Sequence, residues 1–348
     1  MRKLASVQKI TKIEPIEGAD RIELAHVLGW QCVVNKGQFR EGDYAVYFEI
    51  DSFLPIRPEF EFLRASSYKK TDLLGEGFRL RTQKFRGQIS QGLLLPVSIL
   101  DGTGWFGLPE GTDVTKLLGV RKYEIPEMAT TGGNVIGTLP YDVPHTDEVR
   151  IQAEPDLLQE FAGREYYIST KMNGSSHSVS LDSDGFHVTG HNYEYKNDGS
   201  SSFYQLVNTL GLKEKMEETA KRLSLKELTV QGEFCGPGIQ KNRLKLQKPE
   251  WYVFTVRENG KRVGLEEMKA VCEALGVKHV PVEEVGDDLP GKYPTVEALL
   301  QRADGEYPNG GKKEGIVIRP VSPVMSGVTG EYLSMKIINN KYLLKNAE

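Results

Sequence analysis

The sequence predicts an α+β protein in two parts, with a small N-terminal β-barrel or sandwich followed by a domain of mixed strands and helices. Three observations lead to this prediction. Short β-prone runs separated by glycine turns fill residues 7–100. Residues 101–140 are rich in Gly, Pro and Thr, which is typical of a connector. After residue 200, apolar residues recur at helical spacing between further β-prone runs.

The composition is that of an ordinary globular protein. With 348 residues, 39% of them hydrophobic, the chain is long enough for about two domains that each have a core. The net charge of −4 excludes a uniformly basic surface, so contact with nucleic acid must depend on local patches. No apolar run reaches the roughly 20 residues of a membrane-spanning helix, and the first residues are too polar for a secretory signal. We therefore expect a cytoplasmic protein without a membrane partner.

The cysteines argue against a zinc site. Cys32, Cys235 and Cys272 are odd in number and widely spaced, and the sequence has no Cys-x-x-Cys pair. We expect reduced thiols that are mostly buried.

Several β-prone runs are expected to form the N-terminal barrel or sandwich. They are Ala25–Val27, Gln31–Asn35, Tyr44–Ile50, Phe78–Arg81 and Leu93–Pro96. Within residues 62–86, basic side chains outnumber acidic ones and are interleaved with aromatic rings, a combination that binds phosphates and stacks on bases. The candidate nucleic-acid-binding residues are Arg79, Arg81, Lys84 and Arg86. A solvated loop with aromatic side chains in the core would give the same pattern.

Periodicity predicts the later elements. A short helix is expected within the connector, over Asp113–Arg121. A hairpin is expected from Ser178–Leu181 and Phe186–Gly190. A broken amphipathic helix over residues 203–223 follows, and another over Leu265–Leu275 has Gly276 as its C-cap. Further strands are expected at Tyr166–Ile168, Leu228–Phe234, Tyr252–Val256, Ile316–Arg319 and Tyr332–Ile338.

Lys171 is the candidate nucleophile. It follows the strand Tyr166–Ile168, and Gly174 allows a tight loop after it. The spacing Lys-x-x-Gly carries no information alone, because it recurs at Lys84, Lys116, Lys196, Lys261 and Lys312. Lys171 is distinguished by the ordered series downstream, which consists of Gln231–Gly236, Trp251–Phe254, Glu314–Arg319 and Ser334–Lys336.

Two acids of that series lie in apolar, β-prone segments. Burying an unpaired carboxylate is costly, so Glu233 and Glu314 are each expected to face a cation or a hydroxyl group. A structural salt bridge would satisfy the same requirement. The sequence has no Walker A spacing and no Gly-x-Gly-x-x-Gly after a strand, so a P-loop or Rossmann phosphate site is not supported.

The ordered motifs resemble those of the covalent lysyl nucleotidyltransferases, the superfamily of ATP-dependent ligases and mRNA-capping guanylyltransferases. The stretches Ile16–Glu23 and Lys84–Leu95 resemble the tRNA-binding OB modules of several synthetases. Thr146–Gln152 resembles the entry to the nucleotidyltransferase domain. An OB-like module in front of the motifs, with little chain behind Lys336, resembles the nick-sealing RNA ligases of the Deinococcus type.

This resemblance implies a domain division and a fold for each part. Residues 1–125 are expected to form an OB-like β-barrel with its connector. Residues 126–348 are expected to form an adenylyltransferase, or RNA ligase, domain of antiparallel sheets with flanking helices.

The resemblance also implies roles for single residues. Lys171 forms a covalent lysyl-AMP from ATP, Lys336 contacts the α-phosphate, and both serve catalysis together with Glu314. Glu233 bonds the ribose and Phe254 packs against the adenine. The residues expected to contact the nucleotide are Gln152, Thr170, His191, Glu233, Phe254 and Arg319, and those expected to hold Mg²⁺ or Mn²⁺ are Asn173, Glu258 and Glu314. Because a free lysine is protonated at neutral pH, we expect Lys336, Arg319 and the metal to lower the pKa of Lys171.

Four positions depart from the pattern of the family. Asn173 replaces a common aspartate, His191 an arginine, and Ser334 a lysine. Thr255 replaces a common acid after the aromatic residue, which leaves Glu258 as a substitute.

The predicted function is an ATP-dependent RNA ligase that joins 5′-phosphate and 3′-hydroxyl ends, as in nick sealing and RNA repair. The expected partner is RNA or an RNA-containing nicked duplex, and the protein is expected to be a monomer. Two alternatives remain open. One is a non-enzymatic RNA-binding OB protein, and the other is a DNA ligase or guanylyltransferase of the same superfamily.

Overall fold

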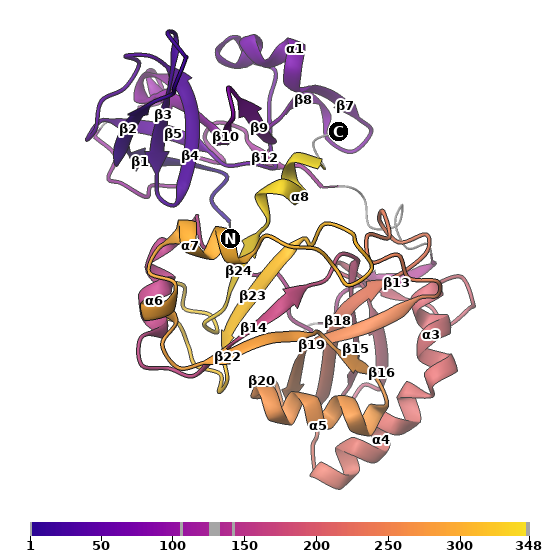
Figure 1. Cartoon of the computed structure of the whole chain (residues 1–348). Coiled ribbons are helices and arrows are strands. Elements are labelled where there is room, and N and C mark those ends of the chain that lie inside the picture. Colours follow the sequence, from indigo (N-terminus) through magenta and orange to yellow (C-terminus); the bar gives the residue numbers. More distant parts are fainter. Residues whose placement is uncertain (1, 105–106, 125–132, 141–142, 346–348) are drawn as a thin grey trace. The chain divides into compact units, whose positions relative to one another are not determined.

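The computed structural model describes residues 2–104, 107–124, 133–140 and 143–345, which divide into two compact units. Of these residues, those up to Glu124, residues 152–155 and residues 343–345 form the N-terminal unit, and the others form the C-terminal unit. Strands dominate the first unit, whereas sheets and helices together build the second (Figure 1). The predicted α+β class is therefore confirmed. In the described ranges, no helix combines the length and the apolar character needed to cross a membrane.

The N-terminal unit consists mainly of short antiparallel strands. They are β1 (Ala5–Lys9), β2 (Lys12–Pro15), β3 (Ile22–Val27), β4 (Trp30–Asn35), β5 (Tyr44–Phe48), β6 (Ser52–Leu54), β7 (Tyr68–Thr71), β8 (Gly75–Arg79), β9 (Thr82–Phe85), β10 (Gln88–Gln91), β11 (Leu93–Pro96) and β12 (Arg121–Lys122). The helical elements are η1 (Pro58–Leu63), α1 (Arg64–Ser67) and η2 (Val97–Leu100). β5 lies between β1 and β11, β3 lies between β2 and β4, and β9 forms a hairpin with β10.

Alternating side chains build the core of this unit. Along β4, Trp30, Cys32 and Val34 are buried while the residues between them are partly exposed. A second apolar cluster lies beneath η1, where the rings of Phe48 and Phe60 meet edge to face at 5.4 Å. β4 therefore buries one face, whereas β1 and β5 are buried on both faces along most of their length.

The helix predicted over Asp113–Arg121 is wrong. The structure has turns there, between a β-bridge at the start of the segment and β12 at its end. The hydroxyl oxygen of Thr115 accepts hydrogen bonds from the backbone N–H groups of Leu4 and Ala5, which fixes the segment against β1. Leu118 is buried in the core from this irregular segment, so its apolar character reflects packing and not helical periodicity.

The remaining strands are β13 (Val135–Thr138), β14 (Tyr166–Lys171), β15 (Ser175–Leu181), β16 (Phe186–Thr189), β17 (Tyr193–Tyr195), β18 (Leu228–Cys235), β19 (Glu250–Glu258), β20 (Lys261–Arg262), β21 (Lys278–His279), β22 (Val282–Gly286), β23 (Gly315–Pro320) and β24 (Met335–Ile338). The remaining helices are η3 (Pro155–Phe161), α3 (Ser202–Leu210), α4 (Leu212–Leu223), α5 (Leu265–Leu275), α6 (Leu289–Lys292), α7 (Val296–Arg302) and α8 (Asn340–Lys345).

The larger sheet of the C-terminal unit has the strand order β13-β17-β16-β15-β18-β19-β20, with α3, α4 and α5 beside it (Figure 1). Side chains of the helices and the sheet meet in one apolar cluster that includes Phe203 and Val230. The predicted break in the first helix occurs at Gly211, which has a φ of +61° and separates α3 from α4. The predicted C-cap of α5, Gly276, is also confirmed, with a φ of +66°.

The smaller sheet has the order β22-β14-β23-β24, with antiparallel neighbours. Its second strand, β14, is buried along nearly its whole length, which explains the aromatic and β-branched residues in Tyr166–Thr170. Lys171 ends β14 and is paired with Gly315, the first residue of β23. Residues of several strands therefore converge at this end of the sheet.

Candidate active site

A cavity of about 190 Å³ lies at the end of β14, and both sheets of the C-terminal unit contribute to its lining. The predicted site residues that line it are Thr170, Lys171, His191, Glu233, Phe254, Arg319 and Lys336. The other lining residues are Thr146, Asp147, Glu148, Ser169, Met172, Ser176, Val280 and Val317. The sequence motifs that stand far apart along the chain therefore meet around one space.

Gly174 is required here for close packing. A Cβ atom at this position would overlap the carbonyl oxygen of Phe234 on β18 and lie 2.8 Å from the Sγ of Cys235. The close approach also lets the N–H of Gly174 donate to the carboxylate of Glu233 at 3.0 Å. The glycine thus joins the loop after Lys171 to the strand that carries Glu233.

Two carboxylates set the electrostatics of Lys171. Its Nζ lies 2.8 Å from Oε1 of Glu314. Burial alone would lower the pKa of Lys171, but the negative charges of Glu314 and Glu233 outweigh burial and raise the pKa above its ordinary value. The predicted lowering of this pKa by Lys336 and Arg319 is therefore wrong, because the two carboxylates dominate, and the contribution of the metal stays a prediction. Burial raises the pKa of Glu233 to about 7, with Lys171 opposing the rise and Glu314 adding to it.

Asn173 lies beside the same carboxylate. Its Nδ2 donates to Oε2 of Glu314 at 3.2 Å and to the hydroxyl of Tyr342 at 3.0 Å. Its Oδ1 is buried and has no hydrogen-bond partner among the described residues. Because buried polar atoms are normally satisfied, this oxygen points to a missing ligand.

The donors around that oxygen suit a hard divalent cation. Asn173 and Glu314 offer oxygen atoms, and the Lys171 pKa shift places the charge of Glu233 in the same site. Within the described ranges, no three His, Cys, Asp or Glu side chains gather as a preformed metal cluster. The chemistry therefore matches Mg²⁺ or Mn²⁺ held partly through water, not a closed structural metal site.

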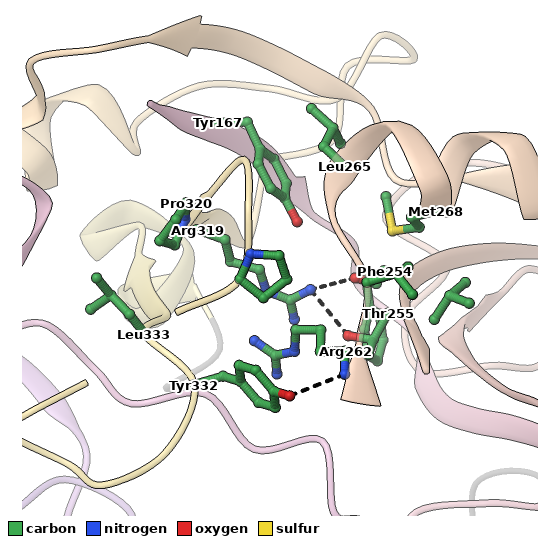
Figure 2. A pocket seen from close by; sticks show the side chains of 13 residues that line it. Tyr167, Phe254, Thr255, Arg262, Leu265, Met268, Arg319, Pro320, Tyr332 and Leu333 are labelled. Carbon is green, nitrogen blue, oxygen red and sulfur yellow. Dashed lines mark hydrogen bonds between the residues drawn. The ribbon is translucent and has the colours of Figure 1, made fainter. Parts of the chain in front are cut away.

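All three nitrogen atoms of the Arg319 guanidinium group donate hydrogen bonds. Its Nε donates to Oγ of Ser334 at 3.2 Å, and its Nη1 donates to Oγ1 of Thr255 at 3.0 Å and to the carbonyl oxygen of Phe254. Its Nη2 donates to the carboxylate of Glu148, which also accepts from the hydroxyl of Ser334. Figure 2 shows the guanidinium group directed from β23 toward Phe254 and Thr255 on β19. Arg319 thus joins four segments of the unit.

The charge in this network comes from Glu148 and not from Glu258, the acid that the sequence offered as a substitute for the one missing at Thr255. Glu258 lies at the far end of β19, where it faces Lys261 across the turn to β20. It is not among the described residues that line the cavity, so its position gives no support to a metal-binding role either. Thr255 accepts a hydrogen bond from Arg319, and the carboxylate reaches the same guanidinium from a different segment.

The ion pair between Glu148 and Arg319 is buried and shifts both groups. Burial alone would raise the pKa of Glu148, but the charges of Arg319 and Arg262 outweigh burial and lower the pKa to about 2. Burial alone would lower the pKa of Arg319, but the charge of Glu148 outweighs burial and raises it. Burial, followed by repulsion from Arg319, lowers the pKa of Arg262 to about 10. Figure 2 shows Arg262 between Arg319 and Tyr332.

Three predicted nucleotide contacts line the cavity from other directions. Phe254 is half-buried on β19, and Lys336 lies on β24 opposite Val317. His191 lies in the turn between β16 and β17, with its Nε2 3.8 Å from Oδ2 of Asp147. An aromatic ring, a cation and an imidazole therefore line the same cavity.

Two other predicted contacts are engaged elsewhere. The hydroxyl of Thr170 donates to Oε1 of Glu283 on β22 at 2.7 Å, although Thr170 does line the cavity. Gln152 is buried in the N-terminal unit, where its carbonyl oxygen accepts a hydrogen bond from the N–H of Gly29. Their roles toward a nucleotide remain predictions.

The N-terminal candidates divide into two kinds. Lys84 and Arg86 are exposed in the β9–β10 hairpin, on either side of Phe85, whose exposed fraction is 41%. Arg79 is half-buried, with its Cζ 4.1 Å from the centroid of a tyrosine ring, and Arg81 is also half-buried. The hairpin is therefore the better candidate for contact with nucleic acid.

Sequence reasoning missed several residues that shape the site. The hydroxyl of Tyr307 donates to the carbonyl oxygen of Lys171 at 2.7 Å, and Tyr342 bonds Asn173. Glu148 belongs to a stretch that the motifs had marked, but nothing distinguished its carboxylate. Tyr307 stands in a Pro- and Gly-rich loop, where no periodic signal identifies an inward-facing hydroxyl group.

Comparisons with known proteins agree with this geometry. The OB-fold domain family matches residues 4–97, and the RNA ligase family matches residues 164–338. Among curated protein sequences, none matches the chain at a significant level.

Several solved structures of Naegleria gruberi RNA ligase are similar to the whole chain. One with pyrophosphate has a TM-score of 0.85 and 32% sequence identity, over 99% of this chain and 98% of that one. A mutant with AMP and Mn has a TM-score of 0.87 and 32% identity, over 100% of both chains. Another mutant with ATP and Mn has a TM-score of 0.87 and 32% identity, over 99% and 100%. The similarity extends through both units.

Proposed function

The chain belongs to the RNA ligase family, and we propose that it uses ATP to join 5′-phosphate and 3′-hydroxyl ends through a lysyl-AMP on Lys171. One observation carries this proposal. The amine of Lys171 stands at the end of a buried strand, 2.8 Å from a carboxylate, and lines a cavity large enough for part of a nucleotide. The ATP, AMP and Mn in the N. gruberi ligase structures support ATP as the substrate and Mg²⁺ or Mn²⁺ as the cofactor.

The first step makes the covalent adduct. The Nζ of Lys171 attacks the α-phosphorus of ATP, a nitrogen–phosphorus bond forms, and the bond to pyrophosphate breaks while the amine loses a proton. Because its pKa is raised in the structure, Lys171 keeps that proton until the charge of Glu314 is offset. Lys336, which lines the same cavity, would stabilise the charge that develops on the phosphate oxygens.

A divalent cation would be held by Glu314 and by the unpartnered Oδ1 of Asn173, with Glu233 contributing charge. When bound, Mg²⁺ or Mn²⁺ supplies positive charge that stabilises the phosphoryl oxygens and opposes the carboxylates beside Lys171. The donor set is small, which suits an ion that keeps much of its water shell.

The next two steps transfer the AMP and seal the strand. An oxygen of the RNA 5′-phosphate attacks the phosphorus on Lys171, the nitrogen–phosphorus bond breaks, and the amine regains its proton. The 3′-hydroxyl then attacks the phosphorus of the RNA 5′-phosphate in the adenylylated end and loses its proton, the phosphodiester forms, and the bond to AMP breaks so that AMP leaves. Lys171 is a nucleophile in the first step and a leaving group in the second.

The base would be bound on the side of the cavity that carries Phe254. Stacking of an aromatic ring on a base is worth about 1 to 3 kcal/mol. Phe254 is well placed for this contact because Arg319 holds its carbonyl oxygen and so fixes the strand on which the ring stands. Glu233 and His191 are the proposed polar contacts, with Gln152 and Thr170 as further candidates.

RNA binding would fall to the exposed hairpin of the N-terminal unit. Lys84 and Arg86 supply positive charge, and Phe85 supplies a stacking face between them. Nicked duplex RNA, in which a broken strand is held by an intact one, is the proposed substrate. We place this activity in RNA repair.

We further propose that the protein acts in the cytoplasm as a monomer. Cys32, Cys235 and Cys272 are all free and buried, as expected for a protein of a reducing compartment. Light scattering on the purified protein would test the monomer, since a mass twice that of the chain would contradict it.

The decisive experiment is labelling with α-labelled ATP and Mn²⁺, followed by denaturing electrophoresis and mapping of the adduct. The wild type is expected to carry AMP on Lys171, and Lys171→Met is expected to take up no label while remaining folded. Lys312→Met is the matched control, because Lys312 has the same spacing to a glycine but forms a surface ion pair with Glu306.

Labelling with GTP, a sealing assay and an RNA-binding assay, run in parallel, separate the alternatives. Labelling by GTP and not by ATP would indicate a guanylyltransferase. Sealing that does not require a ribose at the 3′ end would indicate a DNA ligase. No adduct with either nucleotide, combined with salt-sensitive RNA binding, would indicate a non-enzymatic RNA-binding protein.

A further inference from the structure

Tyr307 joins the main chain of Lys171 to that of Glu314 through a single hydroxyl group. The hydroxyl donates to the carbonyl oxygen of Lys171 at 2.7 Å and accepts from the N–H of Glu314 at 3.2 Å. Tyr307 as a residue is 3% exposed.

The bridge stands where the ladder between β14 and β23 stops. Lys171 and Gly315 are the last paired residues, so Glu314 lies just outside the ladder. Beyond this pair the two chains separate, and the side chains of Lys171 and Glu314 meet 2.8 Å apart. The phenol therefore links the two segments at the point from which both side chains leave the sheet.

The ring of Tyr307 is held in place independently of those two residues. The backbone N–H of Tyr307 donates to the carbonyl oxygen of Gly311 at 2.7 Å, and the backbone carbonyl oxygen of Tyr307 accepts from the N–H of Gly310 at 2.8 Å. The ring packs in an apolar cluster with Met172 and Val280, which themselves line the cavity. Tyr307 is not among the described residues lining the cavity, so any effect on the reaction must pass through the groups it holds.

This position requires a group that can donate and accept a hydrogen bond at once. One oxygen must donate to a carbonyl and accept from an N–H at once, which a hydroxyl does and a methyl or a ring C–H does not. Removing the oxygen would take a hydrogen-bond partner from two backbone groups, at the residues that carry the nucleophile and the carboxylate. The chain would then move to satisfy them.

We propose that Tyr307 is a positioning residue that fixes the backbone of Lys171 relative to that of Glu314 for the attack on ATP. This inference rests on the proposed role of Lys171. It concerns the geometry of the chemical step and not the binding of ATP, since Tyr307 makes no direct contact with the cavity. A displacement of about 1 Å at a reacting group is enough to slow a reaction about a hundredfold.

The test is the single-turnover rate of adenylylation in Tyr307→Phe over a range of ATP concentrations. Tyr166→Phe is the matched control, because Tyr166 is a buried tyrosine at the other end of β14 whose hydroxyl donates to Glu284 at 2.8 Å. Both variants lose one buried hydroxyl group, and rates are normalised to the folded fraction measured by thermal unfolding. A third variant, Tyr307→4-aminophenylalanine, restores a group that both donates and accepts.

For Tyr307→Phe, the rate at saturating ATP is expected to fall between about tenfold and a hundredfold, with half-saturation changed less than about threefold. Tyr166→Phe is expected to keep both values, and the amino variant is expected to recover most of the rate. A folded Tyr307→Phe that adenylylates at the wild-type rate would overturn the inference. An equal loss in Tyr166→Phe, or no recovery in the amino variant, would also overturn it.

Failure of the proposed function has a different signature. In that case the wild type itself takes up no AMP, or takes it up at a residue other than Lys171. Normal labelling of Lys171 in the wild type and in Tyr307→Phe would reject only the role of Tyr307.

Discussion

Lys171 and Glu314 form an ion pair of 2.8 Å at adjoining ends of β14 and β23. The carboxylate that is proposed to hold the metal is therefore the same group that keeps the nucleophile protonated. This relationship explains why the pKa of Lys171 is raised in the structure although the proposed reaction requires a free amine. It also allows the two functions of Glu314 to be separated.

Glu314→Gln is expected to lower the pKa of Lys171 and at the same time to abolish adenylylation. The neutral amide no longer attracts the ammonium group, so burial acts with less opposition, but the metal loses a charged ligand. The pKa is measured by the pH dependence of Lys171 modification with an amine-reactive reagent, and adenylylation by label uptake. Glu266→Gln, which alters an exposed ion pair on α5, is the control. Faster labelling in Glu314→Gln would contradict the metal role.

Asn173→Asp is expected to strengthen metal binding and to lower the stability of the protein when no metal is bound. A second carboxylate beside Glu314 adds charge for the cation but removes the amide that now donates to Glu314. The Mn²⁺ concentration for half-maximal labelling is expected to fall about tenfold. The melting temperature is expected to fall in EDTA and to recover with Mn²⁺. Asn208→Asp, on the surface of α3, should show neither change.

Glu148→Gln is expected to remove an acid-sensitive part of the stability. The pKa of Glu148 is lowered to about 2 in the folded state, from an ordinary value of 4.5. Its contribution is therefore complete above pH 4.5 and is lost as the pH falls toward 2. Breaking this buried pair is expected to cost about 3 kcal/mol at pH 7, and the difference from the wild type should shrink with acid.

Urea unfolding at pH 7 and pH 3, followed by hydrogen exchange in β23, measures this difference. Glu76→Gln, in a surface pair with Lys70, is the control and should change the stability little. A Glu148→Gln protein that remains as stable as the wild type at pH 7 would contradict the assigned role of the pair.

Thr170→Val is expected to reduce stability by about 1 kcal/mol without changing the ATP concentration for half-maximal labelling. The hydroxyl of Thr170 already donates to Glu283, which also accepts from Lys313 at 2.9 Å. An increase in half-saturation of tenfold or more would instead show that Thr170 contacts the nucleotide through its side chain.

Phe85→Ala is expected to weaken RNA binding and sealing while leaving ATP labelling intact. Its ring is exposed between two cations, and loss of one stacking contact costs about 1 to 3 kcal/mol. The affinity for nicked RNA is measured at several salt concentrations, because removal of the ring should leave the salt slope unchanged. Lys84→Ala should reduce that slope. Tyr44→Ala, at an exposed tyrosine on β5, is the control.

The sequence was informative where a function requires a residue type in a fixed order along the chain. Lys171, Glu233, Phe254 and Lys336 were identified in this way, and they line one cavity in the structure. Strands that bury both faces and helices with one apolar face were also predicted. The helix expected at Asp113–Arg121 failed because irregular chain can bury leucines as well as a helix does.

Partners chosen only by the tertiary fold were not predictable. Glu148 and Arg319 are 171 residues apart, and nothing in the sequence indicates that this carboxylate meets the guanidinium group. The raised pKa of Lys171 was missed for the same reason. The direction of this pKa shift depends on which charges lie within a few ångströms of the amine. Here the carboxylates of Glu314 and Glu233 affect the pKa more than any cation does.

The strand order of the smaller sheet has a consequence for synthesis of the chain. β14 carries Lys171, yet both of its neighbours, β22 and β23, lie far downstream, and the facing residues Ser169 and Val317 are 148 positions apart. During synthesis, this apolar strand therefore lacks a complete set of paired neighbours until β23 has left the ribosome. Such long-range pairing is slow and exposes a strand to aggregation. Nascent chains that stop before β23 consequently carry Lys171 on a strand whose sheet is incomplete, and they should aggregate more readily than the full chain.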